Sequence, residues 1–168
     1  MLVEEQSGWT TEIGIKRILE PYMVCMESER TGEELESFVP FHGLGASAAE
    51  RLLKLLPSQQ LDGRQNYGPT TLQLLQAAVA HPGQVELVGY AIGPTRPDER
   101  VSIEGFVYYG APDFHVEAFH ETSCECDALW EYLERELGLD SALDRPDEIT
   151  KIRPSWNPGR EGWWVWWD

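Results

Sequence analysis

Two runs of alternating β-branched and aromatic side chains constrain the fold more than any other feature of this sequence. They span Gln84 to Ile92 and Arg100 to Tyr109, and a rather long loop over 93–99, with one glycine and two prolines, joins them. Alternation with a period of two is typical of β-strands, and two such strands joined by a loop without a crossover element are antiparallel neighbours. The sequence therefore predicts a β-hairpin. Because both alternating sets are largely apolar, the two strands are expected to lie centrally or to have both faces covered.

Three segments have the apolar spacing of helices that pack one face against a core. They span residues 47–57, 69–81 and 121–138. The first and the third begin with the Ser/Thr-x-x-Glu spacing of a capping box, at Ser47 and at Thr122. The second begins with a proline, which fits the first helical position because that position needs no amide hydrogen.

The remaining segments complete an α+β pattern. A short helix is predicted over 11–19, and strands are predicted at 22–26, 35–39, 114–119, 148–153 and 162–168, with a helix over 31–38 as the alternative to the second strand. Strands joined by short turns favour an antiparallel sheet with helices packed against it. The fold class expected is thus α+β: a single domain over 1–168, with a mainly antiparallel sheet of about five to six strands and three helices.

Charge is concentrated in one part of the chain. The sequence has 13 Lys and Arg against 29 Asp and Glu, a net charge of −16, although 42% of its residues are hydrophobic. Residues 113–148 hold 12 of the acids and only 2 bases, and so carry −10 of that charge. The chain is too apolar for an acidic disordered tail. It is also too acidic for a nucleic-acid binder that depends on cations, so direct nucleic-acid binding is not expected.

The acidic stretch suggests a binding role. Our first hypothesis is a non-enzymatic module that presents an acidic helix face to a basic protein partner, because local negative potential speeds association with cationic surfaces. The alternative is that this charge only maintains solubility. A homodimer also stays open. The candidate partner-binding residues are Glu125, Asp127, Glu131, Glu134, Asp140 and Asp144.

The C-terminal tryptophans form the second unusual feature. On a strand over 162–168, Trp163, Val165 and Trp167 point to one face, while Trp164 and Trp166 point to the other. Either both faces are buried, with Trp130 among the residues packed against one of them, or one face is exposed. An exposed face would be a partner interface, a dimer interface or a platform for a sugar ring.

A small-molecule site is the alternative function. Arg64, Asn66 and Tyr67 precede a predicted helix N-terminus, which offers free amides to an anion, although such residues also serve simply to close turns. Together with Trp156, Trp164 and Trp166, they are the candidate ligand-binding residues. In this hypothesis Trp and Tyr side chains line a pocket that is polarised by Arg64, His115 or His120.

A zinc site is a third possibility. His115, His120, Cys124 and Cys126 are suitable ligand types, but their spacing matches no standard zinc finger, and on one strand the two histidines would point to opposite faces. The simpler interpretation places them at the surface and in the core, with no cofactor. Three cysteines give no disulfide framework. With no leader-like or membrane-spanning segment, this indicates a cytoplasmic protein. No complete catalytic motif is present, so the sequence does not decide whether the protein is an enzyme.

Overall fold

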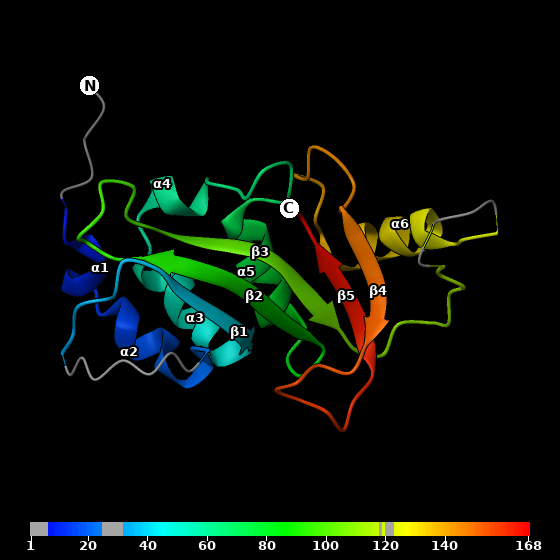
Figure 1. Ribbon diagram of the computed structural model, residues 1–168. Coiled ribbons are helices and arrows are strands. Elements are labelled where there is room, and N and C mark those ends of the chain that lie inside the picture. The colour runs from blue at the N-terminus through cyan, green and yellow to red at the C-terminus, as the bar shows by residue number, and fades with distance from the viewer. Residues whose placement is uncertain (1–6, 25–31, 118, 120–122) are drawn as a thin grey trace.

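A five-stranded antiparallel sheet forms the centre of the molecule (Figure 1). The structure is a computed structural model that describes residues 7–24, 32–117, 119 and 123–168. The strands are β1 (Val39–Leu44), β2 (Val85–Ile92), β3 (Arg100–Tyr108), β4 (Glu148–Ile152) and β5 (Gly162–Trp166). Their order across the sheet is β1-β2-β3-β5-β4, so the last strand of the chain lies between β3 and β4. The predicted α+β class is confirmed.

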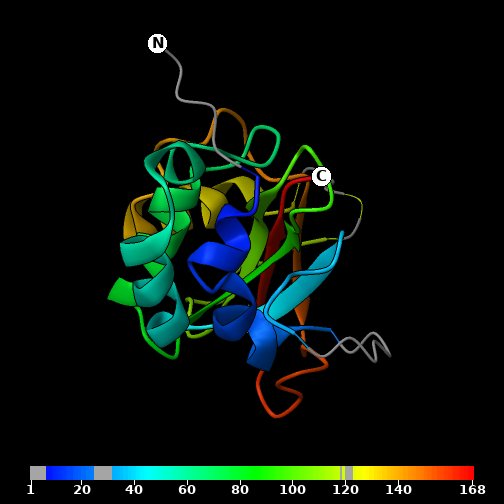
Figure 2. The same cartoon turned by 90° about the vertical axis from the view of Figure 1, so that its left-hand side faces the viewer.

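The helices gather on one face of this sheet (Figures 1 and 2). They are α1 (Trp9–Glu12), α2 (Ile15–Leu19), α3 (Ala46–Leu55), α4 (Ser58–Leu61), α5 (Thr71–Ala80) and α6 (Cys126–Leu137), with a 3₁₀ turn at Glu20–Tyr22. The three longest, α3, α5 and α6, correspond to the three main helices expected. α1 and α2 lie largely in the segment predicted as a short helix over 11–19, and α4 is additional. Within the described ranges, no helix is long and apolar enough to cross a membrane.

The core lies between the helices and the sheet. Leu87 of β2 pairs with Phe106 of β3, which in turn pairs with Val165 of β5, and all three side chains are buried. Trp167 is buried on the same face and meets Trp130 of α6 edge-on, with ring centroids 5.2 Å apart. Burial of large aromatic side chains contributes strongly to stability, so this pair joins α6 firmly to the sheet.

A buried carboxylate fastens the first helix. Glu99, in the loop between β2 and β3, accepts hydrogen bonds from the backbone amides of Gly8 and Thr10 at 2.8 and 2.9 Å. It also accepts one from the Thr10 hydroxyl. These amides lie at the start of α1, where backbone donors lack helical partners. The loop of the hairpin therefore supplies the cap that α1 does not have in its own sequence.

The hairpin and the C-terminal strands agree closely with the sequence predictions. β2 and β3 pair in antiparallel register from Val85 with Tyr108 to Ile92 with Arg100. The register shifts at Val88 and Gly89, where a bulge accommodates one extra residue of β3. The strands predicted at 148–153 and 162–168 form as β4 and β5, one or two residues shorter.

The predicted helix starts were wrong. α3 has Gly45 as its N-cap, so Ser47 lies inside the first turn and caps nothing. α6 starts at Cys126 rather than near 121, and its N-cap makes no side-chain capping bond, while the Ser123 hydroxyl donates to Glu117 instead. Thr122 lies outside the described residues. α5 begins after Thr70, whose hydroxyl accepts from the amide of residue 73, so the proline at 69 precedes the cap.

Several predictions in the less periodic segments were also wrong. The described part of 114–119 forms no strand, and β1 begins at Val39 instead of near 35. The described part of 31–38 is not helical either, and the helix predicted over 11–19 is interrupted at Gly14. At 22–26, Met23 makes a single bridge to Phe41, and Val24 is exposed; residues 25 and 26 lie outside the described residues.

Gly105 is one of the sheet positions, with Gly89, where a side chain would meet the backbone of the neighbouring strand. A Cβ added there would lie 2.2 Å from the carbonyl oxygen of Val165 in β5. We expect Gly105→Ala to lower the free energy of unfolding by more than about 2 kcal/mol, because β3 and β5 must separate. Gly159→Ala, whose Cβ would meet nothing within 4 Å, is the matched control and should change it by less than about 0.5 kcal/mol. Urea unfolding measures both, and equal midpoints would contradict this close approach.

Candidate functional site

The predicted partner-binding residues lie on and beside the outer surface of α6. The helix buries Leu129, Trp130 and Leu133 toward the sheet, so its charged positions face outward. We call the following set the α6 acidic surface: Glu125, Asp127, Glu131, Glu134, Asp140 and Asp144. All are exposed except Glu134, which is half-buried. The helical period therefore brings most of the predicted residues together, and the turn after Gly138 adds the last two.

Few of these carboxylates are neutralised. Asp127 forms an ion pair with Arg145, and Asp140 accepts a hydrogen bond from the Gln73 side chain at 2.6 Å. Glu131 and Glu134 form no ion pair with any described residue. Like charges close together on one surface reinforce each other's potential, so this surface is a strongly negative part of the described molecule.

A second surface lies on the opposite face of the sheet, where the described structure places no helix (Figure 2). Trp164 and Trp166 are half-buried there, with ring centroids 6.5 Å apart and planes inclined by 30°. Trp163, Val165 and Trp167 point to the core, as the period of two predicts. Trp156, from the loop between β4 and β5, joins the same face near the end of β1. The two sequence alternatives were a strand buried on both faces and a strand with one face exposed; the structure lies between them, with the outward tryptophans half-buried.

Each of these three indole N–H groups donates to a glutamate. Trp164 Nε1 lies 2.9 Å from Glu148 Oε2, and Trp166 Nε1 lies 3.2 Å from Glu104 Oε2. Trp156 Nε1 donates to the carboxylate of Glu86. The carboxylates come from three different strands, β4, β3 and β2. We call this set the Trp–Glu face: Trp156, Trp164, Trp166, Glu86, Glu104 and Glu148.

Sequence reasoning found the tryptophans of this face but missed the glutamates. Glu86 alternates with two core residues of β2, which was a usable signal for its orientation. Glu148 stands directly opposite Trp166, but only the pairing of β4 with β5 shows this. Glu104 lies at the bulge of β3, where alternation gives no reliable direction.

The loop that carries Trp156 is fastened to the sheet by several contacts. Trp156 stacks on His42 with centroids 4.3 Å apart. Gly43, at φ +75°, leaves room for it, because a Cβ there would lie 2.7 Å from Trp156 Cδ1. Beside it, burial and the Glu86 carboxylate raise the pKa of Tyr109 to about 12. The guanidinium of Arg160 covers the Tyr109 ring at 4.1 Å. The position of Trp156 is thus well determined.

Arg64, Asn66 and Tyr67 do not join the three tryptophans. Arg64 donates to the backbone carbonyls of Gly68 and Ser141, at 3.1 and 2.5 Å, and so braces two loops. Asn66 closes a turn with φ 50°. Tyr67 is exposed. Gly68 of this loop lies against Trp167, a ring of the core face, whereas Trp164 and Trp166 lie on the other face. The contacts of Arg64 therefore agree with the role of closing turns, and not with binding of an anion.

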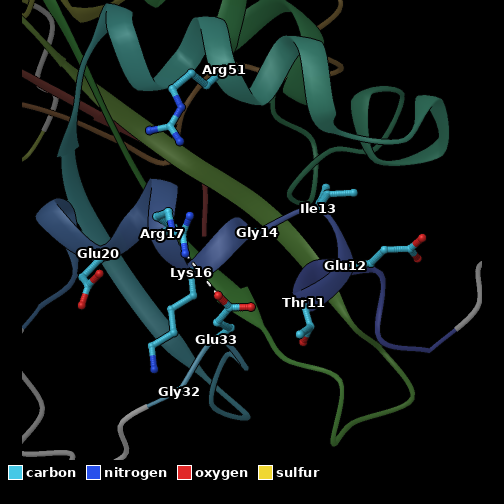
Figure 3. Close-up of a pocket in the computed structure, with 10 residues that line it drawn as sticks. All are labelled: Thr11, Glu12, Ile13, Gly14, Lys16, Arg17, Glu20, Gly32, Glu33 and Arg51. Atoms are coloured by element: carbon cyan, nitrogen blue, oxygen red, sulfur yellow. Dashed lines mark hydrogen bonds and ion pairs between the residues drawn. The ribbon is translucent and has the colours of Figure 1, made fainter.

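Two described cavities offer little to the aromatic-pocket hypothesis. One, of about 430 Å³, lies among α1, α2 and α3 (Figure 3). It is lined by three cations and three carboxylates, among them Arg17 and Glu33, which form an ion pair at 3.1 Å. The other, of about 120 Å³, includes Arg64 and Arg100. Neither lining contains Trp or Tyr, and the charges of the first are balanced.

The histidine and cysteine cluster is organised by Glu117. Its carboxylate contacts His115 Nε2 at 2.8 Å and accepts from the Ser123 hydroxyl at 2.7 Å. The sulfur of Cys124 lies 3.3 Å from the Glu117 amide. Burial, followed by the neighbouring Cys124 thiol, raises the pKa of Cys126. The fourth predicted metal ligand, His120, lies outside the described residues, and among the described ones no three His, Cys, Asp or Glu side chains are arranged to hold a metal ion.

Comparison with protein families, with curated proteins and with solved structures gives no match to this chain. The two surfaces are therefore interpreted from their own chemistry. Carboxylates and ring faces attract cations. Both surfaces therefore hold groups that attract cations.

The His115–Glu117 contact predicts a pH-dependent contribution to stability. The hydrogen bond to Glu117 raises the pKa of His115 above 6.5, and the bonds from Ser123 and His115 lower the pKa of Glu117 below 4.5. The histidine contribution is lost as pH rises through its raised pKa, and the glutamate contribution is lost as pH falls through its lowered one. The pair therefore contributes most between pH 4.5 and 6.5.

We expect Glu117→Gln to return the His115 pKa toward its ordinary value, measured by NMR titration of the imidazole carbon-bound protons. His81 in the same spectra serves as the internal control. An unchanged His115 pKa in the variant would contradict the contact.

Proposed function

We propose that this protein is a binding protein for a basic protein partner, which it meets with the α6 acidic surface. The observation that carries the proposal is a group of neighbouring carboxylates, all exposed except the half-buried Glu134. Of these, Glu131 and Glu134 have no ion-pair partner among the described residues. Keeping like charges close together costs stability, and a cationic surface would relieve that repulsion.

The arrangement of the helix supports a rigid surface. α6 is anchored by Leu129, Trp130 and Leu133, so its outward carboxylates are held on a fixed element instead of a loop. Asp140 accepts a hydrogen bond from Gln73 of α5, which connects the turn after α6 to the helical layer. A fixed array of charges gives directional attraction, and its main effects are on association rate and on choice of partner.

The experiment must separate a specific acidic surface from overall charge. The test variant combines Glu131→Gln, Asp140→Asn and Asp144→Asn. The control combines Glu12→Gln, Glu20→Gln and Glu34→Gln, which are exposed carboxylates of the N-terminal half with no ion pair to a described residue. Each variant removes three charges, so both have the same net charge.

With a 12-residue peptide of alternating lysine and glycine as the probe, we expect the test variant to bind about tenfold more weakly at 20 mM salt. The control should change affinity less than twofold, and binding of the unmodified protein should weaken steeply with salt. Isothermal titration calorimetry measures all three. Equal weakening in both variants would mean that the charge acts only through the whole molecule and would overturn the proposal.

A further inference from the structure

We propose that the Trp–Glu face binds the cationic side chains, arginine above all, of an extended segment of a protein partner. This inference rests on the proposed function, because it identifies a second contact with the same basic partner. It adds a different surface, on the opposite face of the sheet from α6, and a different recognition chemistry.

The first support is the state of the carboxylates. In Glu104 and Glu148, Oε2 accepts an indole N–H, and Oε1 has no hydrogen-bond partner among the described residues. Neither glutamate forms an ion pair with a described residue. Each therefore keeps an acceptor oxygen without a described partner beside an aromatic ring. A guanidinium can donate to such an oxygen while its plane lies on the ring.

The second support is the electronic effect on the rings. A carboxylate lies at the N–H edge of each indole, and the negative ring face is already the side that attracts cations. A charged acceptor at the positive edge increases that negative character. Trp164 and Trp166 are only half-buried, and they lie on the side of the sheet without a described helix (Figure 2). A cation can thus approach both rings.

The third support is spacing. The centroids of Trp164 and Trp166 are 6.5 Å apart. In an extended chain, residues i and i+2 point to the same side and lie about 6.6 Å apart, since each residue advances about 3.3 Å. A segment with arginine at alternate positions therefore places one guanidinium over each ring.

The composition of the face favours cations over other ligands. Nucleic acid would bring phosphates against Glu86, Glu104 and Glu148. A sugar also stacks on tryptophan, but its hydroxyls need donors as well as acceptors. Here the indole N–H groups are already used by glutamates, and the Asn157 amide donates to Glu86 at 3.1 Å. Acceptors predominate, and they complement a ligand that only donates.

The probe for the test is an acetylated and amidated peptide, Gly-Arg-Gly-Arg-Gly. Its controls are the same peptide with citrulline, which keeps the shape but loses the charge, and a peptide with two adjacent arginines. The protein variant is Glu104→Gln with Glu148→Gln, because glutamine can still accept from the indoles. Glu12→Gln with Glu34→Gln is the variant matched in charge.

We expect the alternating arginine peptide to shift the Nε1–H resonances of Trp164 and Trp166 in ¹H–¹⁵N spectra. Its affinity should fall at least tenfold with citrulline, at least threefold with adjacent arginines, and at least tenfold in the Glu104/Glu148 variant. The matched variant should change it less than twofold. Trp166→Leu, checked for folding by urea unfolding, should also weaken binding at least fivefold.

Two results would overturn the inference. In the first, the arginine and citrulline peptides bind equally well. In the second, a β-linked glucose hexasaccharide shifts the two indole signals but the arginine peptide does not. The neutralised α6 variant separates the two proposals. If it loses lysine-peptide binding while the Glu104/Glu148 variant binds the arginine peptide normally, the proposed function stands and this inference fails. If only the Glu104/Glu148 variant loses binding, the Trp–Glu face stands and the role of α6 fails.

Discussion

Insertion of β5 between β3 and β4 is the interaction on which both faces of the molecule depend. β5 pairs with β3 through Trp163 to Trp166 and with β4 along its whole length. Because neighbouring side chains on a strand point to opposite faces, the register that buries Trp163 and Val165 also turns Trp164 and Trp166 outward. A slip of one residue would exchange the two sets. The core and the Trp–Glu face are therefore fixed by the same hydrogen bonds.

Strictly periodic segments of the fold were predictable, and locally ambiguous ones were not. The alternation in β2, β3 and β5 is reinforced by long-range pairing, so pattern and structure agree. The predicted helix starts were wrong because capping depends on where the backbone enters the helix. Ser47 lies two residues past the N-cap Gly45, and the Ser123 hydroxyl donates to Glu117. At 114–119, β-propensity exists without any partner strand in the described sheet, and propensity alone does not hold a strand.

The candidate surfaces were predictable to different degrees for a related reason. Within α6, the outward position of the acidic side chains follows from the helical period, which needs no knowledge of other elements; Asp140 and Asp144 belong to the turn that follows the helix. The Trp–Glu face needs the strand order, because Glu104 and Glu148 reach β5 from strands on its two sides. The order β1-β2-β3-β5-β4 places a C-terminal strand inside the sheet, and no local pattern specifies this. Arg64 shows the converse case. Its residue type suggested that it binds a ligand, whereas its hydrogen bonds to two backbone carbonyls show that it connects two loops.

The two proposed surfaces would contribute to binding through different physical interactions. α6 lies behind β4 in Figure 1, and Glu148 lies on the opposite face with Trp164, so a basic segment that passes around this edge stays close to carboxylates. Attraction by the exposed acids reaches about 10 Å and weakens with salt, whereas contact with the tryptophan rings is short-ranged and less sensitive to salt. The α6 acidic surface and the Trp–Glu face therefore complement a cationic partner in two different ways.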